Sequence, residues 1–233
     1  MNELQFRNTI QACLDNGERL LSDVLMLEFS EPPATAFALV IIAQEEFAKA
    51  FLLTLVCKGV IPWNKFIRRA TRDHTCKQLL IMIMDYLNPD VDEFIARINV
   101  PIEKQMTSAF PPHIADAINI FRHEKIRRWE SGNWFWADPP NYAPKAKKVG
   151  NGEIDRLKQD QLYVNISKDG FVIPKTVITQ SQFEDEKYRA ERLSSLVRGM
   201  VDENRTSYLE YKEVTETLRI MFANMASNHK KDR

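Results

Sequence analysis

Residues 34–59 read ATAFALVIIAQEEFAKAFLLTLVCKG, and this apolar stretch decides the fold. Apolar residues dominate on every side of it, which predicts a buried helix at residues 32–58 that ends at Gly59. The helix carries an adjacent acid pair, Glu45 and Glu46, at its middle. A charge inside an apolar helix destabilises the fold unless a counter-charge lies beside it. The acid pair therefore indicates where a functional site is to be sought.

The next segment supplies the counter-charges. Residues 60–77 read VIPWNKFIRRATRDHTCK and lie at the start of a helix predicted at residues 63–88. Because short connections favour antiparallel neighbours, one of the two acids is expected to face the arginines or the histidine of this helix. Ordinary intrahelical pairs with Lys49 on a solvated stripe are the alternative. The candidate catalytic residues are Glu45, Glu46, Arg68, Arg69 and His74.

The composition favours an all-α fold. Glycine is scarce, at 7 of 233 residues, and strand-like alternation is rare. We therefore expect an antiparallel helical bundle that forms a single domain over residues 1–233. The expected main helices span residues 3–29, 32–58, 63–88, 112–131 and 181–224.

One insertion interrupts this bundle. Residues 132–180 are expected to form it, because prolines and glycines recur through residues 132–160 and indicate irregular structure. Alternating apolar residues on both sides of Gly170 predict a small β-hairpin before the long C-terminal helix. The remaining expectations are hairpin strands at residues 162–166 and 171–173, N-caps at Ser30 and Ser181, a short helix at 90–98 and a loop at 99–111.

Charge and cysteine content narrow the class of protein. Lysine plus arginine equals aspartate plus glutamate, at 32 each, so any electrostatic binding must come from local patches. Cys13, Cys57 and Cys76 are odd in number and lack metal-ligand spacing, which is typical of reduced cysteines in a cytoplasmic protein. The longest apolar run is too short to span a bilayer, so no membrane partner is expected.

An arginine and a histidine close in sequence have a chemical use. Arg68 or Arg69 can hold a phosphate while His74 transfers a proton, which suits RNA cleavage by the ribose 2′-hydroxyl. The alternative is a solvated first turn of a helix, with Asp73 and His74 at the surface. The sequence has no Glu-x-x-His, His-Glu-x-x-His, Cys-x-x-Cys or glycine-rich phosphate loop, so neither a metal nor a cofactor is expected.

A second region combines basic and aromatic residues. Residues 122–148 hold seven lysines and arginines against three acids, and three of the four tryptophans. This pattern suits single-stranded nucleic acid, through phosphate contacts and base stacking. An aromatic insertion that packs back on the bundle, or a dimer contact, is the alternative. The candidate nucleic-acid-binding residues are Lys77, Arg122, Lys125, Arg127, Arg128, Trp134 and Trp136.

The two quoted segments resemble the AbiV family of bacterial abortive-infection proteins. The resemblance rests on Glu45, Glu46 and Lys49 in the apolar helix, and on His74 and Lys77 in the segment that follows. Residues 162–174, LYVNISKDGFVIP, also resemble a segment of the family. The likeness extends over about residues 10–200.

The family is similar to the HEPN superfamily of helical proteins. This similarity implies a helical bundle, usually a homodimer with paired sites near the dimer axis. Many relatives are metal-independent RNases with an Arg-x(4–6)-His motif, a spacing that only Arg68 or Arg69 with His74 has here. A polar residue usually follows the motif's arginine. Arg68, followed by Arg69, fits loosely, and Arg69, followed by Ala70, does not.

The resemblance implies an anti-phage effector that arrests growth or translation on infection. Its molecular action is open between metal-independent RNA cleavage and a non-catalytic protein- or RNA-binding module that blocks translation through a phage-triggered interaction. A helical scaffold whose charges form structural pairs is a third interpretation. The expected partners are a second copy of the chain, RNA or a translation component, and a phage protein that acts as trigger.

Overall fold

The computed structural model describes residues 1–27, 33–98, 110–132, 141–168, 170–174, 178–202 and 211–222. These residues are mostly helical, which confirms the expected all-α class. The first helices are α1 (Glu3–Leu25), α2 (Ala34–Cys57), α3 (Lys65–Ala70), α4 (His74–Leu87) and α5 (Val91–Ile98). The later ones are α7 (Pro112–Asn119), η1 (Ile120–Arg127), α8 (Arg128–Ser131), α9 (Pro144–Gly150), α10 (Glu153–Asp160), α11 (Gln180–Val201) and α12 (Tyr211–Phe222).

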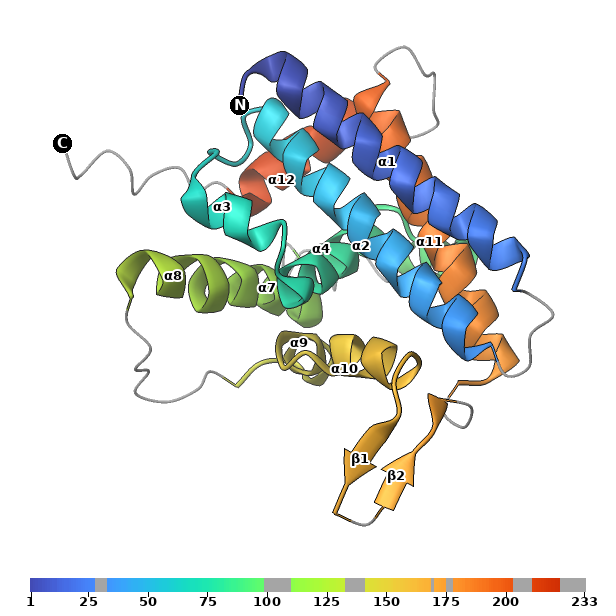
Figure 1. Cartoon of the computed structure of the whole chain (residues 1–233). Coiled ribbons are helices and arrows are strands. Elements are labelled where there is room, and N and C mark those ends of the chain that lie inside the picture. The colour runs from blue at the N-terminus through green and yellow to red at the C-terminus, as the bar shows by residue number, and fades with distance from the viewer. Residues whose placement is uncertain are drawn as a thin grey trace.

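Helix α2 forms the centre of the core. It is apolar on all sides, and α1, α4 and α11 pack around it, with α1 and α2 antiparallel (Figure 1). Gly17 of α1 allows a close approach, because a Cβ atom there would lie only 2.4 Å from Cε1 of the buried Phe47. The acid pair of α2 is therefore held in the middle of the packed bundle.

The helix expected at residues 63–88 is divided in two. Asp73 has extended backbone (φ −79°, ψ 119°), and its side chain accepts a hydrogen bond from the amide of Cys76 at 2.8 Å. This is the geometry of an N-cap, which starts a new helix instead of continuing the old one. As a result α3 ends at Ala70, and His74 becomes the first residue of α4.

Residues 132–160, expected to be irregular, contain α9 and α10. Pro144 occupies the first turn of α9, where a proline needs no amide donor. Gly152 has a positive φ of 76° and precedes α10 directly. The prolines and glycines of this segment thus delimit helices. The insertion contributes two helices that pack against the bundle below α4 and α7 (Figure 1).

The hairpin and the C-terminal segment differ in detail from expectation. Strands β1 (Asn165–Ser167) and β2 (Gly170–Val172) pair antiparallel, with Ile166 opposite Phe171, and project away from the helices (Figure 1). The expected helix at 181–224 is present as α11 and α12, and residues 203–210 lie outside the described residues. Thr179, not Ser181, caps α11, through a reciprocal pair with Gln182. The cap expected at Ser30 lies outside the described residues, as does the loop at 99–109.

Polar contacts fix α11 against the other core helices. Arg189 and Arg192 both pair with Asp85 of α4. Arg198 pairs with Glu18 of α1. These contacts tie α11 to α4 and to α1. Among the described residues, no helix has the length and apolar character needed to cross a membrane.

Candidate functional site

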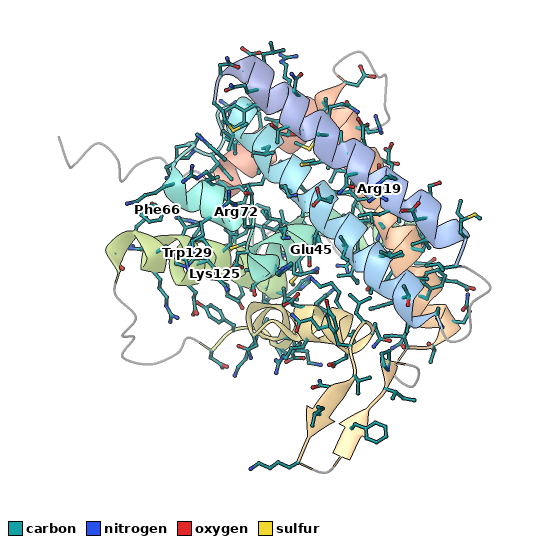
Figure 2. All side chains as sticks on the ribbon, in the orientation of Figure 1. Arg19, Glu45, Phe66, Arg72, Lys125 and Trp129 are labelled. Carbon is teal, nitrogen blue, oxygen red and sulfur yellow. The ribbon has the colours of Figure 1, made fainter. Side chains whose placement is uncertain are left out.

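A buried carboxylate lies at the centre of the site. Glu45 projects from α2 with only 3% of its side chain exposed, and Figure 2 shows it in the interior of the molecule. Its Oε2 atom accepts a hydrogen bond from Nζ of Lys77 at 2.7 Å, and its Oε1 atom accepts one from Nζ of Lys158 at 2.9 Å. Nδ1 of His74 lies 2.6 Å from Oε2. Each carboxylate oxygen therefore has at least one charged or polar partner.

Two further elements bring these partners to α2. His74 and Lys77 lie on the first turn of α4, three residues apart and therefore on one face of that helix. Asp155 and Lys158 have the same spacing on α10, and Nζ of Lys158 lies 2.7 Å from Oδ1 of Asp155. We call Glu45, His74, Lys77, Asp155 and Lys158 the polar cluster. It contains two carboxylates and two ammonium groups, so these charges balance without the imidazole.

The neighbours of each charge set its protonation. Burial alone would raise the pKa of Glu45, but Lys77 and Lys158 outweigh it and hold that pKa below its ordinary value of 4.5. Burial alone would lower the pKa of Lys158, but Asp155 and Glu45 together raise it above the ordinary 10.5. At neutral pH the cluster therefore holds a carboxylate beside ammonium groups.

The contact with Glu45 fixes the tautomer of His74. A carboxylate only accepts hydrogen bonds, so the 2.6 Å contact requires the proton on Nδ1 of His74. Lys158 lies 3.1 Å from the same nitrogen, but both groups are donors, and this is a contact without a hydrogen bond. The imidazole is 48% exposed. With the proton on Nδ1, the opposite nitrogen, Nε2, is the one that can exchange a proton with a substrate. A buried carboxylate behind a half-exposed histidine can orient a general acid or base.

Three members of the polar cluster have metal-ligating groups. One ligand atom each from Glu45, His74 and Asp155 lies within 4.8 Å of the others. However, the ammonium of Lys158 lies 2.9, 3.1 and 2.7 Å from Glu45, His74 and Asp155 respectively. A divalent cation could bind these three groups only by displacing a buried ammonium group that already neutralises them.

Among the described residues, the other candidates for the catalytic site make no hydrogen bond or ion pair with His74. Glu46 pairs with Lys49 of its own helix at 2.6 Å, as the intrahelical alternative describes. Arg68 is exposed on α3. The guanidinium of Arg69 lies over the ring of Trp129, 4.4 Å from its centroid. The structure thus brings Glu45 and His74 together and directs the two arginines elsewhere.

The residues expected to bind nucleic acid divide into four groups. Lys77 is buried in the polar cluster, and its ammonium is committed to Glu45. Lys125 and Arg128 line a pocket of about 410 Å³, where Figure 2 shows Lys125 beside Trp129. Arg122 and Arg127 lie on η1 but do not line this pocket. Trp134 and Trp136 lie outside the described residues.

Sequence reasoning missed Asp155 and Lys158. A signal for them exists in residues 153–160, EIDRLKQD, where Ile154 and Leu157 have helical spacing. Both pack against the core and turn the adjacent Lys158 inward. The surrounding prolines and glycines obscured this short amphipathic helix.

The fold and the site together define a class of protein. The chain is an all-α bundle in which a buried carboxylate orients a half-exposed histidine at a helix N-terminus. The family model HEPN_AbiV, described as AbiV, matches residues 5–195, which include every member of the polar cluster. The chain therefore belongs to the AbiV family, whose members are abortive-infection defence proteins. Neither a curated protein nor a solved structure matches it.

Proposed function

We propose that this protein is an anti-phage effector that arrests growth or translation by cutting RNA without a metal ion. One observation carries the proposal: the imidazole of His74 is half exposed, and the buried carboxylate of Glu45 holds its Nδ1 atom at 2.6 Å. Membership of an abortive-infection family supports the biological part. We further propose that the protein acts as a homodimer in the cytoplasm, as is usual among HEPN proteins.

The chemistry uses the exposed nitrogen of His74. Nε2 takes the proton from a ribose 2′-hydroxyl, and the 2′-oxygen forms a bond to the adjacent phosphorus atom. The bond from phosphorus to the 5′-oxygen breaks, and that oxygen receives a proton from the imidazolium or from water. The products are a 2′,3′-cyclic phosphate and a 5′-hydroxyl. Glu45 stabilises the imidazolium that forms in between, as a carboxylate behind a catalytic histidine does.

Lys158 and Lys77 act as positioning residues. Each donates to one oxygen of Glu45 and keeps the carboxylate ionised, since both hold its pKa down. Lys158 also contacts Asp155 and lies against the imidazole of His74. The ammonium group of Lys158 already neutralises the two carboxylates to which a metal ion would bind, and this supports a reaction that persists in the presence of a chelator.

The test is cleavage of total cellular RNA by purified protein in EDTA, with and without lysate from phage-infected cells. We expect wild-type protein to produce 2′,3′-cyclic phosphate ends. His74→Ala should reduce the rate by about 10²–10⁴-fold, the usual contribution of a general acid or base. Because the side chain is half exposed, the variant should remain folded.

His123→Ala is the matched control, because His123 lies on η1 outside the polar cluster. It should cut RNA as wild type does.

Lys77→Met and Lys158→Met each remove one ammonium group from Glu45, and both lysines are 7% exposed. If the two variants have similar melting temperatures, Lys158→Met should cut RNA more slowly than Lys77→Met, because Lys158 also contacts Asp155 and lies against the imidazole of His74. Equal cleavage by wild type and His74→Ala would exclude the proposed chemistry.

A second candidate function, a non-catalytic binding module, is favoured by the hairpin. Ile166 and Phe171 form a cross-strand pair and are 85% and 72% exposed. Tyr163 and Val164 beside them are exposed as well. Exposed apolar side chains that gather on a projecting element are typical of protein contact sites. In this role the hairpin would bind a protein partner, such as a phage protein or a translation component.

The paired change Ile166→Ser with Phe171→Ser tests this role. It removes exposed apolar area without opening the core, so the melting temperature should stay close to that of wild type. If binding through the hairpin carries the function, phage protection in cells should be lost while His74→Ala keeps it. The opposite pattern, protection lost only with His74→Ala, would contradict the binding module.

A further inference from the structure

A pocket lies at the junction of α3 and α4, and Asp73, which directly precedes His74, forms part of its wall. The pocket of about 410 Å³ is bounded by the end of α3, by one face of η1 and α8, and by the end of α9. Its volume is within the usual range for small-molecule sites, which is about 300–1,000 Å³. We call it the cationic pocket. Its lining residues are Arg69, Asp73, Ile120, Glu124, Lys125, Arg128, Trp129, Tyr142, Lys147, Gly150 and Asn151.

The π-helical segment η1 builds one wall of the cationic pocket. Its backbone pattern widens the helix, so residues four and five apart in sequence share a face. Ile120, Glu124, Lys125 and Trp129 have this spacing, and all four line the pocket. Segments of π-helix are rare in proteins, and those that occur often lie at functional sites. The unusual backbone therefore coincides with the cavity.

The lining has two positive charges without counter-charges. Lys125 lies 3.7 Å from Asp73, and Arg128 lies 3.6 Å from Glu124, so these four charges balance. Within the part of the chain that the structure describes, Arg69 and Lys147 have no acidic partner. Two such cations at one pocket match the charge of a phosphate group.

The same pocket presents flat surfaces. The guanidinium of Arg69 lies over Trp129 at 4.4 Å from the ring centroid, and Tyr142 lines the pocket as well. Burial and a hydrogen bond to the neighbouring Glu124 raise the pKa of the Tyr142 phenol, so it remains protonated and uncharged. Aromatic rings and guanidinium planes are the surfaces on which unpaired nucleobases stack. Phosphate charge and stacking planes thus occur together.

We propose that the cationic pocket binds one nucleotide unit, with its phosphate at Arg69 and Lys147 and its base on the plane formed by Arg69 and Trp129. Two sources share this chemistry: a free nucleotide and one nucleotide of an RNA strand. Asp73 of the pocket wall directly precedes His74, so a nucleotide of a bound strand would lie next to the cleavage site. Binding of an RNA strand beside a cleavage site rests on the proposed function, whereas binding of a nucleotide in the cationic pocket does not.

The experiment is calorimetric titration with two probes. One is adenosine 5′-monophosphate, and the other is a single-stranded RNA hexamer with 2′-O-methyl groups, which the proposed chemistry cannot cut. Lys147→Ala should weaken binding by about tenfold, as expected for loss of one charge-assisted hydrogen bond. Lys148→Ala is the matched control, because this exposed lysine is adjacent on α9 but does not line the pocket. It should change affinity by less than about twofold.

Each outcome has a defined meaning. Binding of both probes, or of one alone, with selective loss in Lys147→Ala supports the nucleotide site, and the probe that binds identifies the source. Absence of binding by either probe, or equal losses in the two lysine variants, overturns it. The His74→Ala variant separates this proposal from the proposed function. If it binds as wild type does and wild type cuts no RNA, the pocket stands and the cleavage proposal fails.

Discussion

Glu45 is stable as a charged residue inside an apolar helix because two ammonium groups meet it there. Lys77 and Lys158 come from different helices, and each donates to a different carboxylate oxygen. Without Lys158, the Oε1 atom of this nearly inaccessible carboxylate would lose its hydrogen-bond donor, which costs free energy in a protein interior. Because Lys158 donates to Oε1, both Lys77 and His74 can donate to Oε2 while each oxygen keeps a partner.

At this scale we predict a pH-dependent effect of Glu45→Gln. The variant leaves two buried ammonium groups without their carboxylate, so at pH 7 its free energy of unfolding should fall by about 3–5 kcal/mol. The folded-state pKa of Glu45 is lowered. Its contribution is therefore present above the unfolded-state value of 4.5 and is lost as the pH falls through the folded-state pKa.

Urea unfolding of wild type and Glu45→Gln at pH 7 and at about pH 3.5 measures this difference. The two stabilities should converge in acid, because a protonated glutamate resembles glutamine in charge. A stability difference that is the same at both pH values would contradict the assignment of an ionised Glu45. Gln11→Ala, an exposed change on α1, provides a reference with little expected effect at either pH.

Part of the candidate site could be predicted residue by residue. The apolar run on both sides of Glu45 indicated that an acid there needs a cation, and the structure provides His74 and Lys77 from the next segment. The guanidinium groups of Arg68 and Arg69 could not be placed, because their direction depends on where α3 ends. The spacing of apolar residues does not show that the helix ends at Ala70, because the only local signal for a new helix is one capping residue, Asp73.

At the scale of elements, the junction between α3 and α4 determines where His74 lies. Asp73 caps α4 and also pairs with Lys125 at 3.7 Å. Asp73→Ala should lower the free energy of unfolding by about 0.5–2 kcal/mol through loss of the cap. Asp73→Asn should retain the cap, since asparagine is an equally good N-cap residue, and should lose only the pairing with Lys125.

Thermal unfolding and RNA cleavage, measured together, distinguish the two roles of Asp73. If the cap positions His74, cleavage should fall in Asp73→Ala and stay near wild type in Asp73→Asn. Equal losses in both variants would indicate that the charge of Asp73, and not the cap, is what matters. Lys125→Ala complements the pair, because it removes the same ion pair and leaves the cap intact.

Prediction of elements succeeded where apolar periodicity was long and failed where helices were short. The core helix α2 follows directly from its sequence. Helices α9 and α10 are short and begin or end at Pro144, Gly150 and Gly152, residues that more often indicate loops. Packing against the bundle stabilises these helices, because helices this short are marginal by propensity alone.

For the whole molecule, the class of fold could be predicted, and the assembly of the site could not. Composition and periodicity indicated a helical bundle with an insertion at residues 132–180, and no residue of that insertion was expected at the catalytic site. In the structure that insertion completes the polar cluster, through Asp155 and Lys158. Such a contact depends on tertiary packing between distant segments, which one sequence does not reveal.

The contact between Lys158 and Glu45 joins residues 113 positions apart, whereas His74 is only 29 positions from Glu45. On the ribosome, a growing chain therefore carries the histidine and its carboxylate well before the lysine of α10 has been translated. The polar cluster is complete only after α10 has been made. For a member of an abortive-infection family, this order of synthesis leaves each nascent chain without the complete polar cluster until α10 has been translated.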